Sequence, residues 1–422
     1  MSEAGGRRPA IGGIDVTALP SPTEFDDQVR RWLSAHGRAP RPQGATSAWE
    51  QGSDEVSVFD DVDDDEQAVR LEEVRAWQRV KFDAGYVPFG GAQPARESGW
   101  PSSYQRRFSE IEAAYDTPQA GELPVVSVSL IAPTIDAMGT PEQRERFLAP
   151  LLKMDEFACQ LFSEPSAGSD LAGIRSRAVR DGDDWILTGH KVWTSGARFA
   201  QWGLAIVRSQ AESSRHHGLT AFLVPLDAPG ITVRPIRQIT GGSSFNEVFL
   251  DEVRVFDSLR LGEPGQGWTV AMTVLAFERD HSTGGGHAVG GSFDDVLGAA
   301  RHFGCTSDVA MREALADLYI HTQIEEITNR RAAAKAQRGA PPGAEGSISK
   351  LLWTQNMARV SDVIARILGP RLTADTGEWG TFAWTAHVLG APGYRIAGGT
   401  DEIQRNILAE RVLGLPREPR AS

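Results

Sequence analysis

The chain has 422 residues, of which 41% are hydrophobic, so it is long enough for two or three domains around a shared core. Its formal net charge of −13 argues against a general nucleic-acid binder, although local arginines and helix N-termini could still hold a small anion. Its two cysteines, Cys159 and Cys305, are too few for a disulfide framework and lack metal-ligand spacing, so we expect no metal and a reducing, cytoplasmic setting.

The first part of the chain predicts helices after a polar extension. Residues 1–45 are rich in Gly, Pro and Arg and contain one short amphipathic stretch near Phe25–Leu33. No apolar stretch follows the two arginines at the N-terminus, so we expect no signal peptide. The apolar run from Leu123 to Pro133 is too short to span a bilayer. Helices are predicted over Glu66–Phe82 and over Pro141–Leu152, the second capped by Thr140. The buried face of the first should carry Val69, Val74, Trp77 and Val80.

Between residues 156 and 262 the pattern changes to short β-branched and aromatic runs broken by turn signals. Asp181-Gly182 separates Ile174–Arg180 from Trp185–Thr188, which predicts a hairpin. The polar tract Ala211–Gly218 is expected to be an exposed loop. Further strands are predicted at Leu204–Val207, Ala221–Val224, Ile231–Val233 and Val248–Leu250.

Helical spacing returns after Gly267 and predicts helices around residues 311–322 and 348–355. A last helix should begin at Thr400, a capping residue that two acidic residues follow in the positive first turn. Its apolar stripe is expected to be Ile403, Ile407, Leu408, Val412 and Leu415. The predicted order is therefore helices, a compact β segment and helices, an α+β multidomain fold.

Three segments combine residue types that can carry chemistry. Ser163–Asp170 offers hydroxyls, carboxylates and backbone N–H groups to a phosphate or a ring, and its alternative is a capped surface turn. His190–Gly196 places a Trp before Thr and Ser, which could pack on a flat cofactor, or the Trp could belong to the core. Gly398–Arg405 is a double-glycine turn into a helix, suited to an anion or a polarised carbonyl, or simply a loop-to-helix junction.

Other motifs are weak or missing. Gly284–Gly291 superficially resembles a dinucleotide-binding loop, but no apolar strand precedes it, which favours a flexible helix interruption. His216-His217 has no partner at ligand spacing, which argues against a metal. The sequence has no nucleophile elbow, Walker A motif or zinc motif.

Taken in this order, the segments resemble the acyl-CoA dehydrogenase family from about Trp77 to Arg417. The matching segments are Phe162–Leu171, Thr188–Ser195, Gly262–Trp268 and Ala397–Ile407. The resemblance implies an N-terminal helical domain over residues 1–155, a β-barrel-like middle domain over 156–263 and a C-terminal four-helix bundle over 264–422. It also implies a tetramer, built from one kind of chain or from two.

The cofactor that this resemblance implies is FAD. The residues assigned to it are Gln160, Phe162, Ser163, Ser169, Trp193, Thr194, Ser195, Thr400 and Glu402. By resemblance, Trp193 packs on the isoalloxazine, and the Ser195 hydroxyl lies near its N5 atom. Ser169 lies near the pyrophosphate and the acyl carrier, while Thr400 and Glu402 approach the phosphates and ribose.

The expected reaction needs a carboxylate to take the α-proton of an acyl thioester while the flavin accepts a hydride from the β-carbon. In many family members this Glu directly precedes the Gly-Thr of the C-terminal motif, where this chain has Gly398, whose N–H could still bind the thioester carbonyl. A minority branch instead carries Glu-Arg on the first long helix after the β domain, as Glu278-Arg279 does here. Glu278 is therefore the candidate base, and Ser169, Arg279 and Gly398 are the candidate substrate contacts. The alternative for Glu278-Arg279 is a solvated helical pair.

The resulting hypothesis is FAD-dependent α,β-dehydrogenation of an acyl thioester, with electrons passed to an electron-transfer flavoprotein. Similar sequences with Gly-Gly-Thr occur in bacterial enzymes that act on bulky or branched acyl groups, some of them mixed tetramers. One departure from the family is the N-terminal glycine-rich loop, reduced to Phe89–Pro94. The alternatives are an inactive partner subunit of a mixed tetramer, a flavin oxidase or monooxygenase of the same fold, and a dehydrogenase for carrier-protein-bound acyl groups.

Overall fold

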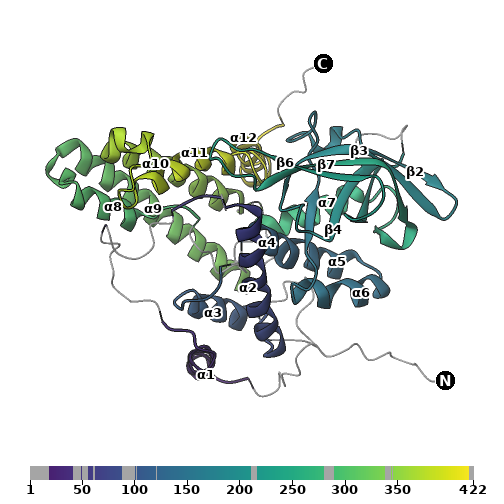
Figure 1. Ribbon diagram of the computed structural model, residues 1–422, viewed down its shortest axis with the longest axis horizontal. Helices are drawn as coiled ribbons and strands as arrows, with labels where there is room; N and C mark the ends of the chain where they lie inside the picture. The colour runs from purple at the N-terminus through teal and green to yellow at the C-terminus, as the bar shows by residue number, and fades with distance from the viewer. Residues whose placement is uncertain are drawn as a thin grey trace.

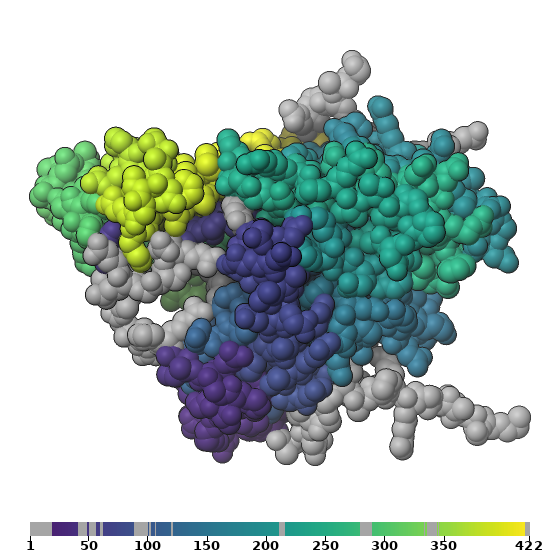
Figure 2. All heavy atoms as spheres, viewed as in Figure 1, coloured from purple at the N-terminus to yellow at the C-terminus, as the bar shows by residue number. Residues whose placement is uncertain are grey.

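The computed structural model describes residues 19–40, 49, 56–59, 62–87, 100, 102–119, 121–210, 216–279, 289–337, 344 and 346–417. Helices come first in the chain, a mixed sheet follows, and helices return after it (Figure 1). Helices α8 (Phe293–His302), α9 (Val309–Gln337), α10 (Gly346–Leu368) and α11 (Thr381–Tyr394) lie at one end of the molecule and the sheet at the other, with helices from the N-terminal part of the chain below them (Figures 1 and 2). The predicted order of elements is confirmed, and the domain limits near residues 155 and 263 stay a prediction.

Several features singled out in the sequence lie outside the described residues. They are the first part of the N-terminal extension, the Phe89–Pro94 segment, residues 211–215 of the polar loop, most of Gly284–Gly291 and the side chain of Arg279.

The N-terminal helices are α1 (Pro22–Ala35), α2 (Asp64–Asp83), α3 (Ser102–Glu112), α4 (Glu122–Val125), α5 (Ala132–Met138) and α6 (Pro141–Leu152). The predicted helix over Glu66–Phe82 is confirmed as α2, and Val74 and Trp77 are buried as expected. The prediction for Val69 is wrong, because its side chain is 59% exposed. The buried face of α2 contains Leu71 instead. Val69 and Leu71 are two positions apart, so their side chains project from nearly opposite sides of the helix.

The apolar run from Leu123 to Pro133 is helical and largely buried, although Val125 is 45% exposed. It comprises α4, a π-helical segment over Val126–Ile131 and the start of α5. The Ser127 hydroxyl accepts a hydrogen bond from the Ala158 N–H at 2.9 Å, which ties this helical stretch to the first strand of the sheet. No helix in the described part of the chain is long and apolar enough to cross a membrane.

The sheet contains β1 (Ala158–Leu161), β2 (Arg177–Asp181), β3 (Asp184–Ser195), β4 (Trp202–Arg208), β5 (Leu219–Pro225), β6 (Ile231–Ile236), β7 (Phe245–Phe256) and β8 (Arg260–Leu261). The strand order is β6-β7-β3-β2-β4-β5-β8, and β1 pairs with β4 in parallel. The predicted hairpin is confirmed: β2 and β3 are antiparallel, and Gly182 turns between them at φ 64°. The other strands predicted by short apolar runs are also present.

Strand β3 carries an irregularity close to its end. Lys191 pairs with Val248 of β7, but the next pair is Thr194 with Asn246, so β3 holds one extra residue between the two pairs. Trp193 lies in this bulge with φ 60°, a conformation uncommon for a non-glycine residue. The bulge changes the alternation of side chains along β3, and Trp193 is exposed beside the buried Val192 and Thr194.

The C-terminal helices are α7 (Gly267–Arg279), α8 (Phe293–His302), α9 (Val309–Gln337), α10 (Gly346–Leu368), α11 (Thr381–Tyr394) and α12 (Asp401–Ile407). The predicted cap of the last helix is confirmed, because the Thr400 hydroxyl accepts from the Ile403 N–H at 3.2 Å. The predicted apolar stripe is partly wrong. A π-helical segment with a different period follows α12 over Leu408–Val412, and Val412 is exposed there. Leu415 is also exposed, and it lies beyond the end of the helical segment.

Candidate active site

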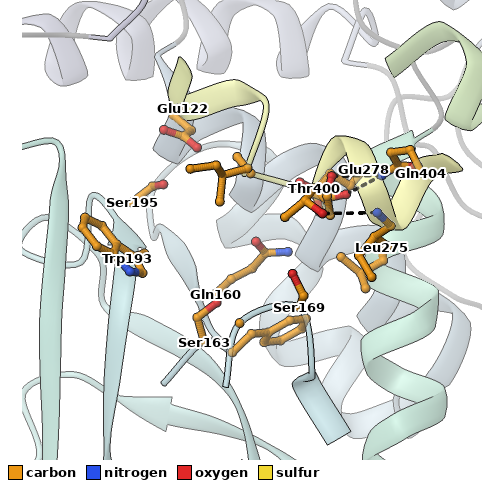
Figure 3. A pocket seen from close by; sticks show the side chains of 18 of the residues that line it. Glu122, Gln160, Ser163, Ser169, Trp193, Ser195, Leu275, Glu278, Thr400 and Gln404 are labelled. Carbon is orange, nitrogen blue, oxygen red and sulfur yellow. Dashed lines mark hydrogen bonds between the residues drawn. The ribbon is translucent and has the colours of Figure 1, made fainter. Parts of the chain in front are cut away.

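A cavity of about 1600 Å³ lies where the sheet, α7 and the turn before α12 meet (Figure 3). A pocket for a single drug-sized ligand typically measures about 300–1,000 Å³, so this cavity has room for two bound groups. The predicted cofactor, substrate and catalytic residues among its lining are Gln160, Phe162, Ser163, Ser169, Trp193, Ser195, Glu278, Gly398 and Thr400. Segments far apart in the sequence therefore meet at one cavity.

The loop Ser163–Asp170 is anchored by a buried ion pair. The Lys191 ammonium is fully buried and lies 2.8 Å from Oε1 of the buried Glu164, and it also donates to the Phe162 carbonyl at 3.2 Å. The second oxygen of Glu164 accepts from the Arg175 N–H at 2.6 Å. Burial raises the pKa of Glu164, but the Lys191 charge and the hydrogen bonds outweigh it and hold that pKa below its ordinary value. Burial lowers the pKa of Lys191 to about 8.

The Trp193 side chain offers a flat apolar surface inside the cavity. It is 61% exposed and lines the cavity from the bulge of β3, on the side opposite Glu278 (Figure 3). Its ring contacts Phe245 of β7 edge-on, with centroids 6.2 Å apart. Of the two possibilities that the sequence left open for this residue, the structure excludes the core tryptophan. An exposed aromatic face in a cavity suits stacking on a flat ring.

The cavity also contains an unpaired polar atom. Nε2 of Gln160 is buried without a hydrogen-bond partner among the described residues. Such a donor is costly to bury unless a ligand or water completes it. A flat stacking surface and an unpaired donor fit the flavin that the sequence resemblance implies. The cationic side chains that line the cavity, and could balance a phosphate charge, are those of Arg237, Arg330, Lys335 and Arg411.

The turn Gly398–Thr400 forms another wall of the cavity. Both glycines have positive φ, 64° and 92°, which a side chain would disfavour. Their carbonyls point into the protein, since the Gly398 carbonyl accepts from Nε2 of Gln404 at 2.9 Å. The Gly399 carbonyl accepts from Nζ of Lys350 at 2.8 Å. The turn is thus held by two buried side chains, of which Gln404 also lines the cavity.

Glu278 reaches this turn from α7. The side chains of Trp268, Met272 and Leu275 line the cavity at helical spacing, and Glu278 lies one turn beyond Leu275 on the same face. A Cβ atom built on Gly398 would lie 2.7 Å from Oε1 of Glu278. The half-buried carboxylate therefore lies directly against the glycine turn. The solvated-pair alternative for Glu278 does not hold.

Two predicted cofactor residues lie away from the cavity lining. Thr194 is buried in β3, and its hydroxyl has no hydrogen-bond partner among the described residues. Glu402 is exposed on the first turn of α12 and forms an ion pair with Arg405 at 3.2 Å. Their roles toward a cofactor stay predictions.

The structure also brings to the site residues that the sequence reasoning did not assign. Phe59, from the N-terminal part of the chain, lines the cavity and packs edge-on against Phe245 at 5.3 Å. Lys350 and Gln404 support the glycine turn. Gln404 lies in the Ala397–Ile407 segment that resembles the family, which is a signal that could have marked it as a site residue. Nothing local in the sequence marks Phe59 or Lys350.

Two domain models of one known protein family match the chain, one over the sheet and one over the C-terminal helices. The acyl-CoA dehydrogenase middle domain matches residues 159–253, and the acyl-CoA dehydrogenase C-terminal domain matches residues 265–413. Acyl-CoA dehydrogenase IpdE1 of Mycobacterium tuberculosis is 38% identical over 350 residues, which covers 82% of this chain and 89% of the relative. The mitochondrial short-chain specific acyl-CoA dehydrogenase of Bos taurus is 30% identical over 305 residues, which covers 69% of this chain and 72% of that relative.

Solved structures agree with this assignment. The steroid ACAD Tcur3481-Tcur3483 aligns with a TM-score of 0.73 at 25% identity, over 96% of this chain and 100% of that one. The ChsE4-ChsE5 complex from Mycobacterium tuberculosis has the same fold, with a TM-score of 0.70 at 24% identity. The alignment covers 96% of this chain and 100% of that one. This chain belongs to the acyl-CoA dehydrogenase family of flavin oxidoreductases, which act on the CH–CH group of an acyl-CoA.

Proposed function

We propose that this protein oxidises the α,β carbons of an acyl-CoA with FAD as cofactor and Glu278 as base. The observation that carries the proposal is the position of the Glu278 carboxylate against Gly398, on a cavity wall opposite Trp193. A base on α7 replaces the carboxylate that position 398 lacks. The cavity is large enough for a cofactor ring and an acyl group together.

The residues proposed to hold FAD surround one side of the cavity. Trp193 would stack on the ring, while Gln160 and Ser195 would meet its polar edge, and Ser163 and Ser169 lie along the neighbouring loop. When bound, FAD supplies the acceptor for the hydride that leaves the β-carbon. The roles of Thr194 and Glu402 toward the phosphates belong to the same proposal, although their side chains lie off the lining.

Glu278 takes the α-proton in this proposal. An α C–H of a thioester is a weak acid, so proton transfer needs a carboxylate at hydrogen-bond distance and partly shielded from water. The half-buried Glu278 meets the second condition. The N–H of Gly398 would stabilise the negative charge that develops on the thioester oxygen, in the manner of an oxyanion hole. Arg279 and Ser169 are the further proposed contacts to the acyl carrier.

The expected substrate is a bulky acyl-CoA. The structural relative Tcur3481-Tcur3483 is a steroid ACAD, and its similarity to this chain supports that class. We further propose that electrons pass to an electron-transfer flavoprotein and that the chain forms a tetramer. The ChsE4-ChsE5 complex makes a tetramer of two kinds of chain a specific possibility to test.

The test is an anaerobic titration of the purified yellow protein with acyl-CoAs of increasing bulk, followed by flavin absorbance. We expect bleaching that is strongest with ring-bearing or branched acyl groups. Absence of bleaching by every acyl-CoA in the panel would overturn the proposal, unless bleaching returned after co-expression with a homologous chain, which would indicate a partner subunit. Peroxide formed in air without another acceptor would instead indicate an oxidase.

A further inference from the structure

A buried cation lies behind the glycine turn, on the side away from the cavity. Lys350 of α10 is 5% exposed, and its Nζ atom donates to the Gly399 carbonyl at 2.8 Å. The charged groups that act on it are Glu278 of α7, Asp401 and Glu402 of α12, and Arg395 after α11. A buried ammonium group is expensive unless nearby charges compensate it, so its placement here needs a reason.

Asp401 supplies the strongest opposite charge that acts on Lys350, but the ammonium group donates its hydrogen bond to the Gly399 carbonyl. The Asp401 carboxylate is almost fully buried, and both of its oxygens have other partners. Oδ1 accepts from the Thr354 hydroxyl at 3.0 Å, and Oδ2 accepts from Arg395 at 2.9 Å. The Lys350 ammonium group donates instead to a neutral carbonyl of the turn. Glu278 is the next opposite charge that acts on Lys350, and its carboxylate contacts Gly398, the residue before the carbonyl that Lys350 binds.

The hydrogen bonds to the turn also fix the direction of its N–H groups. In a trans peptide the C=O and N–H point to opposite sides, and the described chain contains no cis peptide bond. The carbonyls of Gly398 and Gly399 point toward Gln404 and Lys350. The N–H groups of Gly399 and Thr400 consequently point the other way, on a turn whose residues line the cavity.

We propose that Lys350 is a positioning residue for the reaction: it holds the Gly398–Thr400 turn by the Gly399 carbonyl, and it places a positive charge beside the turn that the Glu278 carboxylate contacts. This inference rests on the proposed function, because it assigns Lys350 a task only if Glu278 is the base. The two tasks are separable, since one depends on a hydrogen bond and the other on a charge.

Three substitutions at position 350 separate the two tasks. Lys350→Gln keeps a donor and removes the charge, Lys350→Met removes both, and Lys350→Arg keeps both. The measurement is the rate of anaerobic flavin reduction by the preferred acyl-CoA as a function of pH, together with FAD content and the thermal unfolding midpoint of each holoenzyme. Gln404→Met removes an uncharged support of the same turn and serves as the matched comparison.

The expected pattern follows from the sign of the charge. A nearby cation favours the charged form of a carboxylate, so its loss should move the acid limb of the pH profile upward. Lys350→Gln and Lys350→Met should both show this shift, whereas Lys350→Arg and Gln404→Met should not. The plateau rate should fall about fivefold in Lys350→Met and Gln404→Met, because the turn loses a hydrogen bond worth about 1 kcal/mol.

Each other outcome counts against the inference. An unshifted limb in Lys350→Gln overturns the electrostatic task, and an unchanged plateau in Lys350→Met overturns the positioning task. If Lys350→Arg folds and both uncharged variants do not, Lys350 serves folding and the inference fails. Failure of the proposed function is distinguishable, because the wild-type flavin would then bleach with no acyl-CoA at any pH.

Discussion

The carboxylate of Glu278 fills the space into which a side chain at position 398 would project. A Cβ atom on Gly398 would lie 2.7 Å from Oε1 of Glu278, closer than two such atoms approach in practice. Carboxylate and side chain therefore exclude each other at this point. A glycine at 398 and a glutamate at 278 form one arrangement, in which the base comes from α7 and the turn contributes only backbone.

Gly398→Ala should consequently damage the reaction more than the fold. The added methyl group must displace the Glu278 carboxylate, so we expect flavin reduction to slow by at least about a hundredfold while FAD is retained. Gly414→Ala is the matched control, because Gly414 has a similar φ of 67° but nothing within 4 Å of its Cβ position. Equal rates in the two variants, measured by stopped-flow bleaching, would contradict the account.

Trp193→Ala should weaken cofactor binding without loss of stability. The ring is 61% exposed, so its removal costs the fold little, but a lost stacking partner is worth about 1 kcal/mol. We expect roughly a fivefold to tenfold higher Kd for FAD, measured by titration of deflavinated protein. Phe256→Ala is the control, since Phe256 is 62% exposed on β7 and lies off the cavity lining. A similar loss of FAD in both would argue against stacking.

Lys191→Met should strongly destabilise the protein. It leaves Glu164 buried without its cation, at a cost of about 3–5 kcal/mol in the free energy of unfolding, measured by urea denaturation. The double variant with Glu164→Gln should recover much of that loss. Arg254→Met, which breaks a solvent-exposed pair with Asp181, should change the free energy of unfolding far less. If Lys191→Met costs no more than this surface change, the anchoring role of the pair is wrong.

His387 should make the protein sensitive to acid. This side chain is fully buried in α11, and its Nδ1 accepts from the Gly291 N–H at 3.2 Å. Burial lowers its pKa from 6.5 to about 4. Because the unfolded chain binds the proton first, stability is full above about pH 6.5 and falls by about 3 kcal/mol as the pH drops to about 4.

The check is the free energy of unfolding across this pH range for His387→Gln, in which the amide oxygen can still accept from Gly291. The variant should lose the His387 part of the pH dependence. His36→Gln, at an exposed histidine, should leave the dependence as it is in the wild type. Parallel curves for the wild type and His387→Gln would contradict this assignment.

Features set by neighbouring residues were predictable from the sequence. The Thr400 and Thr140 caps and the hairpin at Asp181-Gly182 each depend on a few adjacent positions, and all three are confirmed. Val69 was placed wrongly because the apolar spacing of α2 admits more than one face, and packing selects the one containing Leu71. The local sequence pattern thus predicts where helices and strands lie, but it does not always predict which face of a helix is buried.

Features set by distant pairing could not be predicted. The exposure of Trp193 depends on a bulge that exists only when β3 pairs with β7. The sequence indicates that Glu278 and Gly398 both depart from the commoner family pattern. That the two residues are in contact depends on how α7 packs against the turn, which the sequence does not show. Nothing near Lys350 in the sequence indicates that α10 brings its ammonium group to the Gly399 carbonyl.

The most direct test of the central claim is anaerobic flavin reduction in Glu278→Gln. The amide has nearly the same shape as the carboxylate and cannot take the α-proton, so the variant should bind FAD and acyl-CoA normally. Its flavin should be bleached at least about a thousandfold more slowly than in the wild type, the range expected when a general base is lost. Bleaching of the intact holoenzyme variant at the wild-type rate would show that Glu278 is not the base.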